Sequence, residues 1–415
     1  MTKNKRKPLC FLLLGAMLLP LFGCASGNVQ EGTVVSGSIT LLNEREDHVA
    51  QYGAPAELSE AAVNFAVELL KNSAAEGENT VISPFSALSA LALTANGAAG
   101  ETRTQTEAVL GAPTQQWNAW FATLTPSQSL HSANSVWLRE NKGLTVEKDF
   151  LYTASDCYDA EVYRAPFDAE TCEYINAWVA EHTDGRIEKL LDGVQENTML
   201  YLINALSFEA DWEEPFRAGN VKQGEFTASD GSVQSIALMF GTQSRYLADE
   251  SAEGFIKEYA DGRYSFVALL PKQGVSAEDY LQTLTGERLR ALLDGETKAH
   301  LSVAIPKLTV ETDLLLNDAL RAMGMTDAFD EGTADLTALG QYRGGRLYVG
   351  QVAHKMLLSL DERGTTAGAV TSVEIPTRTA GIGKELLLNR PFLLAIWDNE
   401  GDMPVFFGII NRVDG

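Results

Sequence analysis

The chain has 415 residues and a formal net charge of −24 at pH 7, with 32 Lys and Arg against 56 Asp and Glu. This length allows one large domain or two ordinary ones, and 45% of the residues are apolar, which permits a sizeable core. The acidic balance argues against nucleic acid or an anionic membrane as a partner, and favours a domain that attracts basic proteins in a salt-dependent way.

Residues 1–23 predict a lipoprotein-type signal peptide. A basic start (KNKRK) precedes an apolar run from Leu9 to Phe22, which is short for a membrane span because a span needs about 20 residues. The string LFGC resembles a bacterial lipobox, which implies cleavage before Cys24 and lipidation of that cysteine. The expected location is the extracellular surface of a bacterium, with the protein anchored to the membrane. An ordinary signal peptide that is cut nearby is the alternative.

Residues 24–55 are polar, contain Gly and Ser and lack sustained periodicity, which predicts a flexible tether. We expect one folded domain over 56–415. Apolar residues at helical spacing predict a helix from about Leu58, and a second helix begins after Ser83-Pro84. A third runs from about Cys172 to Val179.

Alternating or continuous apolar runs predict strands in the rest of the domain. Helices lie mainly in the first half and strands in the second, which indicates an α+β fold. The predicted strands are 131–139, 199–208, 264–270, 300–310, 348–360, 385–397 and 404–411.

Cys10 and Cys24 belong to the export signal, which leaves Cys157 and Cys172 in the rest of the chain. Their spacing matches neither a CxxC motif nor a metal site. Two free thiols are the first expectation, and one disulfide is the alternative in an exported protein.

Enzymatic motifs are hard to find in this chain. It has no GxSxG, no HExxH and no phosphate-binding glycine loop. No acidic pair stands out as an acid/base couple, and the five histidines are scattered. His354 lies where a predicted strand enters the core, which favours a core histidine over a catalytic base. We therefore expect no enzymatic activity, no cofactor and no metal site.

The stretch 354–378 carries the most functional information. It begins as a strand with apolar side chains on one face, passes through small residues from Gly364 to Ala369, and then alternates again to Ile375. A loop does not need such alternation, whereas a segment that becomes a half-buried strand does. The pattern indicates a segment able to leave solvent and join a sheet.

Several segments of the chain resemble the serpins, the serine protease inhibitors, over about 56–415. The resemblance implies a large, mainly antiparallel central β-sheet with additional sheets, about eight to nine helices and an exposed reactive-centre loop at about 362–385. The segments that carry it are NTVISPFSALSALALTANGAAGET (79–102), INAWVAEHTDGRIEKLL (175–191), TMLYLINALSFEADWEEPF (198–216), IPKLTVETDLLLNDALRAMGMTDAF (305–329) and NRPFLLAIWDNEGDMPVFFGIINRV (390–413).

The resemblance also assigns three groups of residues beneath and beside the central sheet. The shutter, a polar cluster under the middle of the sheet, comprises Ser83, Ser86, Asn204 and His354. The breach, where the loop first enters the sheet, comprises Trp212, Lys307 and Glu362, and an ion pair is expected between the last two. The hinge, the leading part of the loop, comprises Glu362, Gly364, Thr365, Ala367, Gly368, Ala369 and Thr371.

The hinge composition favours an inhibitor over a non-inhibitory binding serpin. Its inward-facing residues are small and uncharged, Gly364 gives conformational freedom, and no Pro occurs before Ile375. Arg363 departs from the family pattern, which has a second acid there, but it should lie outward. Family spacing places the scissile bond between Arg378 and Thr379.

The mechanism that the resemblance implies is suicide inhibition. The target's serine forms an acyl-enzyme at Arg378, the freed loop inserts into the sheet, and the protease is trapped as a covalent complex. An Arg suits trypsin-like serine proteases. An elastase-like target cut at Thr377 or Thr379, a cysteine protease and a non-inhibitory binding protein remain alternatives. The partners are the protease and, through Cys24, a membrane; a monomer without nucleic acid is expected.

Overall fold

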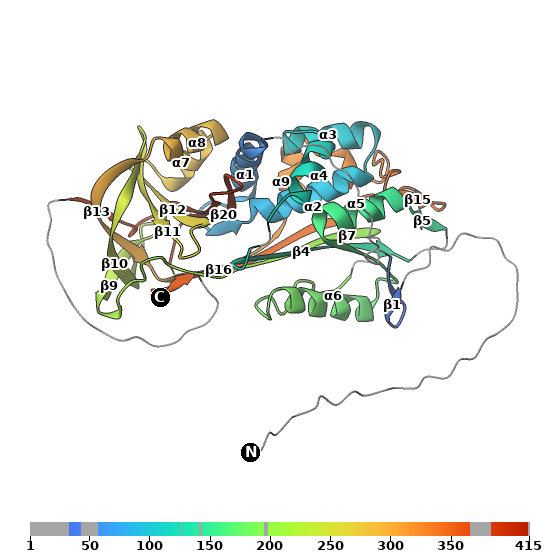
Figure 1. Cartoon of the computed structure of the whole chain (residues 1–415), viewed down its shortest axis with the longest axis horizontal. Coiled ribbons are helices and arrows are strands. Elements are labelled where there is room, and N and C mark those ends of the chain that lie inside the picture. Colours follow the sequence, from blue (N-terminus) through green and yellow to red (C-terminus); the bar gives the residue numbers. More distant parts are fainter. Residues whose placement is uncertain are drawn as a thin grey trace, which may run out of the picture.

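A computed structural model of the chain describes residues 33–42, 57–125, 127–140, 143–194, 198–365 and 383–413. These residues form two large sheets and nine α-helices, in agreement with the predicted α+β class (Figure 1). The helices are α1 (Ser59–Ser73), α2 (Pro84–Gly97), α3 (Gly100–Leu110), α4 (Thr114–Ala122), α5 (Lys148–Tyr158), α6 (Ala169–His182), α7 (Ala277–Thr283), α8 (Gly286–Asp294) and α9 (Asn317–Ala322), with 3₁₀ turns η1 (Ala218–Asn220) and η2 (Asp327–Phe329).

Local sequence explains where helices α2 and α6 begin. Pro84 occupies the first turn of α2, where a missing N–H costs nothing, and the Ser83 hydroxyl accepts the Ser86 N–H at 3.2 Å. At α6, the Asp168 carboxylate accepts the Thr171 N–H at 3.0 Å and completes a capping box. These caps fix the start of each helix against the first sheet.

The first sheet has the strand order β1-β2-β6-β4-β7-β16-β17-β8, with β14 also paired to β16. Two of its contacts are parallel, β4 with β6 and β7 with β16, and the remaining contacts are antiparallel. The sheet is therefore mainly antiparallel, as expected. Its strands are β1 (Thr33–Ser36), β2 (Ile39–Leu41), β4 (Leu130–Arg139), β6 (Ala160–Ala165), β7 (Leu200–Phe208), β8 (Ala210–Asp211), β14 (Leu308–Leu315), β16 (Gln351–Leu360) and β17 (Gly364–Thr365).

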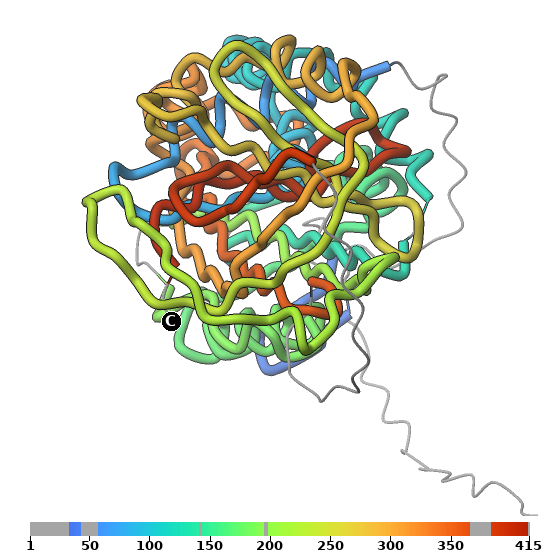
Figure 2. The backbone as a smooth tube through the Cα atoms, turned by 90° about the vertical axis from the view of Figure 1, so that its left-hand side faces the viewer, coloured from blue at the N-terminus to red at the C-terminus, as the bar shows by residue number. Residues whose placement is uncertain are grey.

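The second sheet, with α7 and α8, forms the end of the molecule that faces the viewer in Figure 2. Its order is β18-β13-β10-β11-β12-β19-β20-β3, with β9 paired to β10. The strands are β3 (Thr80–Ile82), β9 (Val221–Thr227), β10 (Val233–Ala248), β11 (Ala252–Glu258), β12 (Tyr264–Pro271), β13 (Thr297–Pro306), β18 (Lys384–Leu387), β19 (Phe392–Asp398) and β20 (Met403–Ile410); β5 (Leu144–Val146) and β15 (Gly340–Tyr342) form a separate pair.

The first sheet is covered on both faces (Figure 1). On one face lie α2, α4 and α5, and on the other lies α6. Ile175, Trp178 and Val179 of α6 belong to an apolar cluster that includes Tyr201 and Ile203 of β7. Because both faces are buried, β7 consists of buried residues along its whole length. No described helix is long and apolar enough to span a membrane.

Two predicted strands are in fact pairs of strands. The predicted strand 300–310 breaks at Lys307, so that β13 joins the second sheet and β14 the first. The predicted strand 385–397 likewise divides into β18 and β19, with Pro391 between them. Sequence reasoning also missed β9, β10 and β11. The 16-residue β10 mixes exposed, half-buried and buried positions without strict alternation, so that its periodicity is weak.

The prediction of a flexible tether over 24–55 is wrong for residues 33–42. These residues form the β1–β2 hairpin, which extends the first sheet by pairing Thr40 and Leu41 with β6. Ile39 is buried, and the Ser36 hydroxyl donates to the Glu170 carboxylate at the start of α6. The segment reads TVVSGSITLL, so that β-branched and apolar residues support its strands in addition to backbone pairing at the open sheet edge.

Candidate functional site

The middle of the first sheet contains two strands that separate along their length. Strands β7 and β16 are parallel neighbours, and their pairing is confined to Tyr201–Ile203 with Gln351–Ala353. At the other end, β17 lies between β16 and β8. We call the space between residues 204–208 of β7 and 354–359 of β16 the strand gap. A strand inserted there would have a neighbour on each side.

The first residues of the predicted hinge already occupy the top of the strand gap. Thr365 pairs with Leu360 of β16 and with Ala210 of β8. Its side chain is only 1% exposed, and its hydroxyl is hydrogen-bonded to the Tyr259 hydroxyl at 2.5 Å. A Cβ at Gly364 would lie 2.0 Å from the Ala210 carbonyl oxygen, so that only glycine fits there. Residues 364–365 thus form a short strand between β16 and β8.

Trp212 holds the chain that leads into the hinge, as the breach prediction implies. Its backbone N–H donates to the Arg363 carbonyl at 2.6 Å, and its indole N–H donates to the Asp361 carbonyl at 3.0 Å. The indole stacks on the Tyr259 ring at 4.5 Å between centroids. Trp212 and Tyr259 therefore form a rigid aromatic surface against which the loop begins.

The predicted ion pair between Lys307 and Glu362 is present. Burial of Glu362 works to raise its pKa, but the hydrogen bond and positive charge of Lys307 outweigh that effect, so that the pKa lies below its usual range. Lys307 lies where the chain passes from β13 to β14. The pair consequently connects the start of the loop to the junction between the two sheets.

Breaking this ion pair should have a small, salt-dependent effect. Both side chains are about a third exposed. Screening by solvent therefore limits the contribution of the pair to the free energy of unfolding to roughly 1 kcal/mol or less. We expect Lys307→Met and Glu362→Gln each to lower the melting temperature slightly at low salt, with no additional loss in the double variant. Melting curves of the four proteins at 0.05 and 1 M NaCl check this. A loss that persists at 1 M NaCl would show that packing, not charge, is responsible.

His354 lies at the middle of the sheet, on β16, and is a core histidine as expected. Its Nε2 accepts the backbone N–H of Ser83 at 3.0 Å. Burial lowers its pKa to about 4, so that the ring is neutral at physiological pH. A neutral ring is required here, because a protonated Nε2 could not accept this hydrogen bond.

Asn204 of β7 connects α2 to the neighbouring strand β4. The Ser86 hydroxyl donates to its side-chain carbonyl, and its amide nitrogen donates to Asn134 at 2.6 Å and to Ser132 at 3.3 Å. The Asn134 amide in turn donates to the Tyr158 carbonyl at 2.9 Å. The four predicted shutter residues are thus close to one another, and they belong to a larger hydrogen-bonded network.

Sequence reasoning missed part of this network, namely Asn134, Ser132 and Ser89. The Ser89 hydroxyl donates to the side-chain Oδ1 of Asn134 at 3.3 Å. A signal was available, because Ser83, Ser86 and Ser89 recur every three residues and therefore share one face of α2. Ser132 and Asn134 also share one face of β4, where a buried Asn needs partners.

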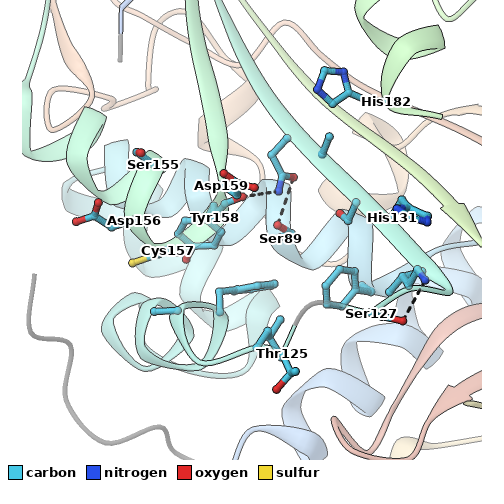
Figure 3. Close-up of a pocket in the computed structure, with 18 of the residues that line it drawn as sticks. Ser89, Thr125, Ser127, His131, Ser155, Asp156, Cys157, Tyr158, Asp159 and His182 are labelled. Atoms are coloured by element: carbon cyan, nitrogen blue, oxygen red, sulfur yellow. Dashed lines mark hydrogen bonds between the residues drawn. The ribbon is translucent and has the colours of Figure 1, made fainter. Parts of the chain in front are cut away.

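A cavity of about 630 Å³ borders the shutter network (Figure 3). Its lining includes Ser89, Asn134 and Tyr158, together with His131 and His182. Within the described ranges, no group of His, Cys, Asp and Glu has the arrangement of a metal site.

Both cysteines of the folded domain are free thiols, as first expected. Cys157 lies in α5 and Cys172 in α6, and both are buried. Burial raises the pKa of the Cys172 thiol, so that it is protonated and unreactive at neutral pH.

The remaining predicted site residues lie outside the described residues. They are Cys24, Ala367, Gly368, Ala369, Thr371, Arg378 and Thr379.

Comparisons with known proteins agree with this geometry. The family model "Serpin (serine protease inhibitor)" matches residues 60–413. A serpin-like protein of Thermococcus kodakarensis is 29% identical over 92% of each chain.

Two solved structures of the thermophilic serpin tengpin are also similar. Its native state is 38% identical with a TM-score of 0.82, covering 88% of this chain and 96% of tengpin. Its latent state is 37% identical with a TM-score of 0.77, covering 88% and 100%. With a family model that spans most of its length and the same fold, the chain belongs to the serpin family.

Proposed function

We propose that this serpin inhibits serine proteases by a suicide mechanism in which its reactive-centre loop inserts into the strand gap. One observation supports the proposal above all others: Thr365 is already paired with Leu360 of β16 and with Ala210 of β8, the strand that directly follows β7, at the open end of the strand gap. A loop whose first residues are strand-paired needs only to continue that pairing.

The register of β17 predicts where the following residues would lie. Thr365 is opposite Leu360 and Ala210. Continued in the same register, residue 367 pairs with 358 and 208, residue 369 with 356 and 206, and residue 371 with 354 and 204. The inward residues of the loop are Ala, Ala and Thr at these positions, which fit beside large buried neighbours without steric conflict. Thr371 would arrive between Asn204 and His354 and could hydrogen-bond to both.

The chemistry uses the target's own catalytic groups. The protease serine attacks the carbonyl carbon of Arg378, and the peptide bond to Thr379 breaks. The new N-terminal amine of Thr379 takes up a proton. The ester that remains joins the protease to the loop. About 15 inserted residues at roughly 3.3 Å each move the bound protease about 50 Å along the sheet. The free energy released by the new strand pairing drives this movement, so that the starting state is kinetically stable only.

A trypsin-like target is the first choice because an Arg side chain suits a pocket with a buried carboxylate. The folded domain carries an excess of acidic residues, which would attract basic proteases. The N-terminal lipobox supports anchoring through Cys24 at a bacterial surface, where such a protease would be met. This location is part of the proposal.

Incubation with trypsin tests the proposal directly. We expect a complex that survives boiling in detergent and a released fragment that begins at Thr379. Arg378→Ala should lower complex formation with trypsin at least tenfold, since the pocket loses its ionic partner, while Arg363→Ala should leave it unchanged. N-terminal sequencing of the fragment and denaturing gels provide the measurement. Cleavage without any complex would show a substrate, and a complex with elastase alone would favour Thr377 or Thr379 as the scissile residue.

A further inference from the structure

A cluster of three side chains fastens the C-terminal end of the loop to the second sheet. Lys384 is the first residue of β18. Its ammonium lies 2.6 Å from the Glu253 carboxylate and 2.5 Å from the Tyr246 hydroxyl, and 4.2 Å from the centre of the Tyr246 ring. The Tyr246 hydroxyl also donates to Glu253. We call Lys384, Glu253 and Tyr246 the Lys384 clip.

The clip is charged at neutral pH. Hydrogen bonds to Glu253 and Tyr246 raise the pKa of Lys384, and the hydrogen bond from Lys384 is the main reason that the pKa of Glu253 lies below its usual range. An isolated exposed ion pair stabilises little. Here one ammonium contacts a carboxylate, a hydroxyl and a ring face together, which makes the contact stronger than a simple pair.

The strand that the clip holds is short and lies at an edge. Strand β18 has four residues and pairs in parallel with β13 only, along residues 301–304. Leu386 is buried, whereas Lys384 and Glu385 are exposed. The end of β18 nearest the loop therefore lacks apolar anchoring, and the Lys384 clip is its principal side-chain contact with the sheet among the described residues.

The topology gives this contact a selective consequence. After cleavage at Arg378, residues up to 378 are no longer connected to β18, so that insertion leaves β18 in place. Insertion of the intact loop is different, because the chain past 378 would be drawn along the sheet and β18 would have to separate from β13. A contact that holds the start of β18 therefore opposes insertion of the intact loop and does not oppose insertion after cleavage.

We propose that the Lys384 clip determines how long the inhibitor stays active, by opposing self-insertion of the uncleaved loop without slowing insertion after cleavage. This rests on the proposed function, in which insertion is the working step. The serpin tengpin has been solved in both a native and a latent state. The present structure is more similar to the native one and has β18 paired to β13.

The test compares Lys384→Met and Glu253→Gln with the unchanged protein. Both variants remove the ionic contact and keep side-chain length. Lys222→Met is a matched control, because Lys222 lies over the Phe240 ring at 5.8 Å in the same sheet, on β9, which pairs with β10 and not with β18. Each intact protein is incubated at a fixed elevated temperature. At intervals, a non-target protease is added, and the fraction of molecules whose loop it still cuts is measured. A second sample of each protein is titrated with trypsin before any incubation.

We expect the cleavable fraction to disappear roughly three to ten times faster in Lys384→Met and Glu253→Gln, an effect of the size a strengthened surface ion pair allows. The double variant should be no faster than either single one, and Lys222→Met should match the unchanged protein. The amount of fresh inhibitor needed per trypsin should not change. Equal lifetimes in all variants, or a parallel rise in inhibitor needed per trypsin, would overturn the proposal. Absence of any trypsin complex in the unchanged protein would instead contradict the proposed function, while the lifetimes would remain measurable.

Discussion

Thr365→Arg should convert the inhibitor into a substrate. In the native protein the Thr365 side chain is 1% exposed and hydrogen-bonded to Tyr259. An arginine there would bring a charge into the apolar space between the sheets, where an unpaired charge costs several kcal/mol. The chain would relieve that cost by keeping residue 365 out of the sheet. Insertion would then fail at its first step, and trypsin would complete hydrolysis before it is trapped.

The measurement is the partition between covalent complex and cleaved inhibitor after incubation with trypsin. We expect at least a tenfold shift toward cleaved product in Thr365→Arg. Thr365→Ser keeps the hydroxyl that contacts Tyr259 and serves as the control, with nearly unchanged partition. An intact ability to form complex in Thr365→Arg would show that residue 365 need not be buried for inhibition.

His354 should make the native protein sensitive to acid. Its pKa is lowered to about 4 by burial, against about 6.5 in an unfolded chain. Between these values the unfolded state binds a proton that the native state does not, so that native stability decreases as pH falls from 6.5 to 4. The difference between the two pKa values corresponds to about 3 kcal/mol in the free energy of unfolding. The native protein has this stability in full above pH 6.5 and loses it as the pH falls toward 4.

The variant His354→Gln tests this contribution. A glutamine carbonyl can accept the Ser83 N–H as His354 Nε2 does, yet it does not titrate. Melting curves at pH 7, 6, 5 and 4 should show a smaller loss for the variant than for the unchanged protein. His131→Gln is a suitable control, because His131 lies on β4 and is exposed. Identical pH profiles for His354→Gln and the unchanged protein would mean that other groups cause the acid sensitivity.

The parts of the site that were predicted came either from a strong local pattern or from the family resemblance. Alternation in 354–378 and the small residues after Gly364 indicated a segment able to join a sheet, and Gly364 is indeed at a position where a Cβ would collide with backbone. The Lys307–Glu362 pair followed from the family resemblance. Asn134 was missed because its shared face with Ser132 only indicated a buried polar group, and its partner Asn204 depends on the pairing of β4 with β7, which is a property of the tertiary arrangement.

One error in the fold, the single strand predicted over 300–310, also has a tertiary origin. The break at Lys307 exists because β13 and β14 belong to different sheets, which is a property of the tertiary arrangement. Residues 33–42 (TVVSGSITLL) form two β-branched and apolar runs around a Ser-Gly-Ser turn, a hairpin signal that was overlooked within a mostly polar segment. Of these two features, only the break at Lys307 has no signal in the local sequence. The Lys384 clip likewise joins residues more than a hundred positions apart.

The melting temperature of the protein before and after the loop is cut tests the insertion mechanism most directly. If the loop inserts into the strand gap, the cut protein gains a complete central strand, and its melting temperature should rise by tens of degrees relative to the intact protein. A protease that cuts within 366–378 without being trapped provides the cut form. If the melting temperature stays the same or falls after cutting, the loop does not enter the sheet, and inhibition by loop insertion is contradicted.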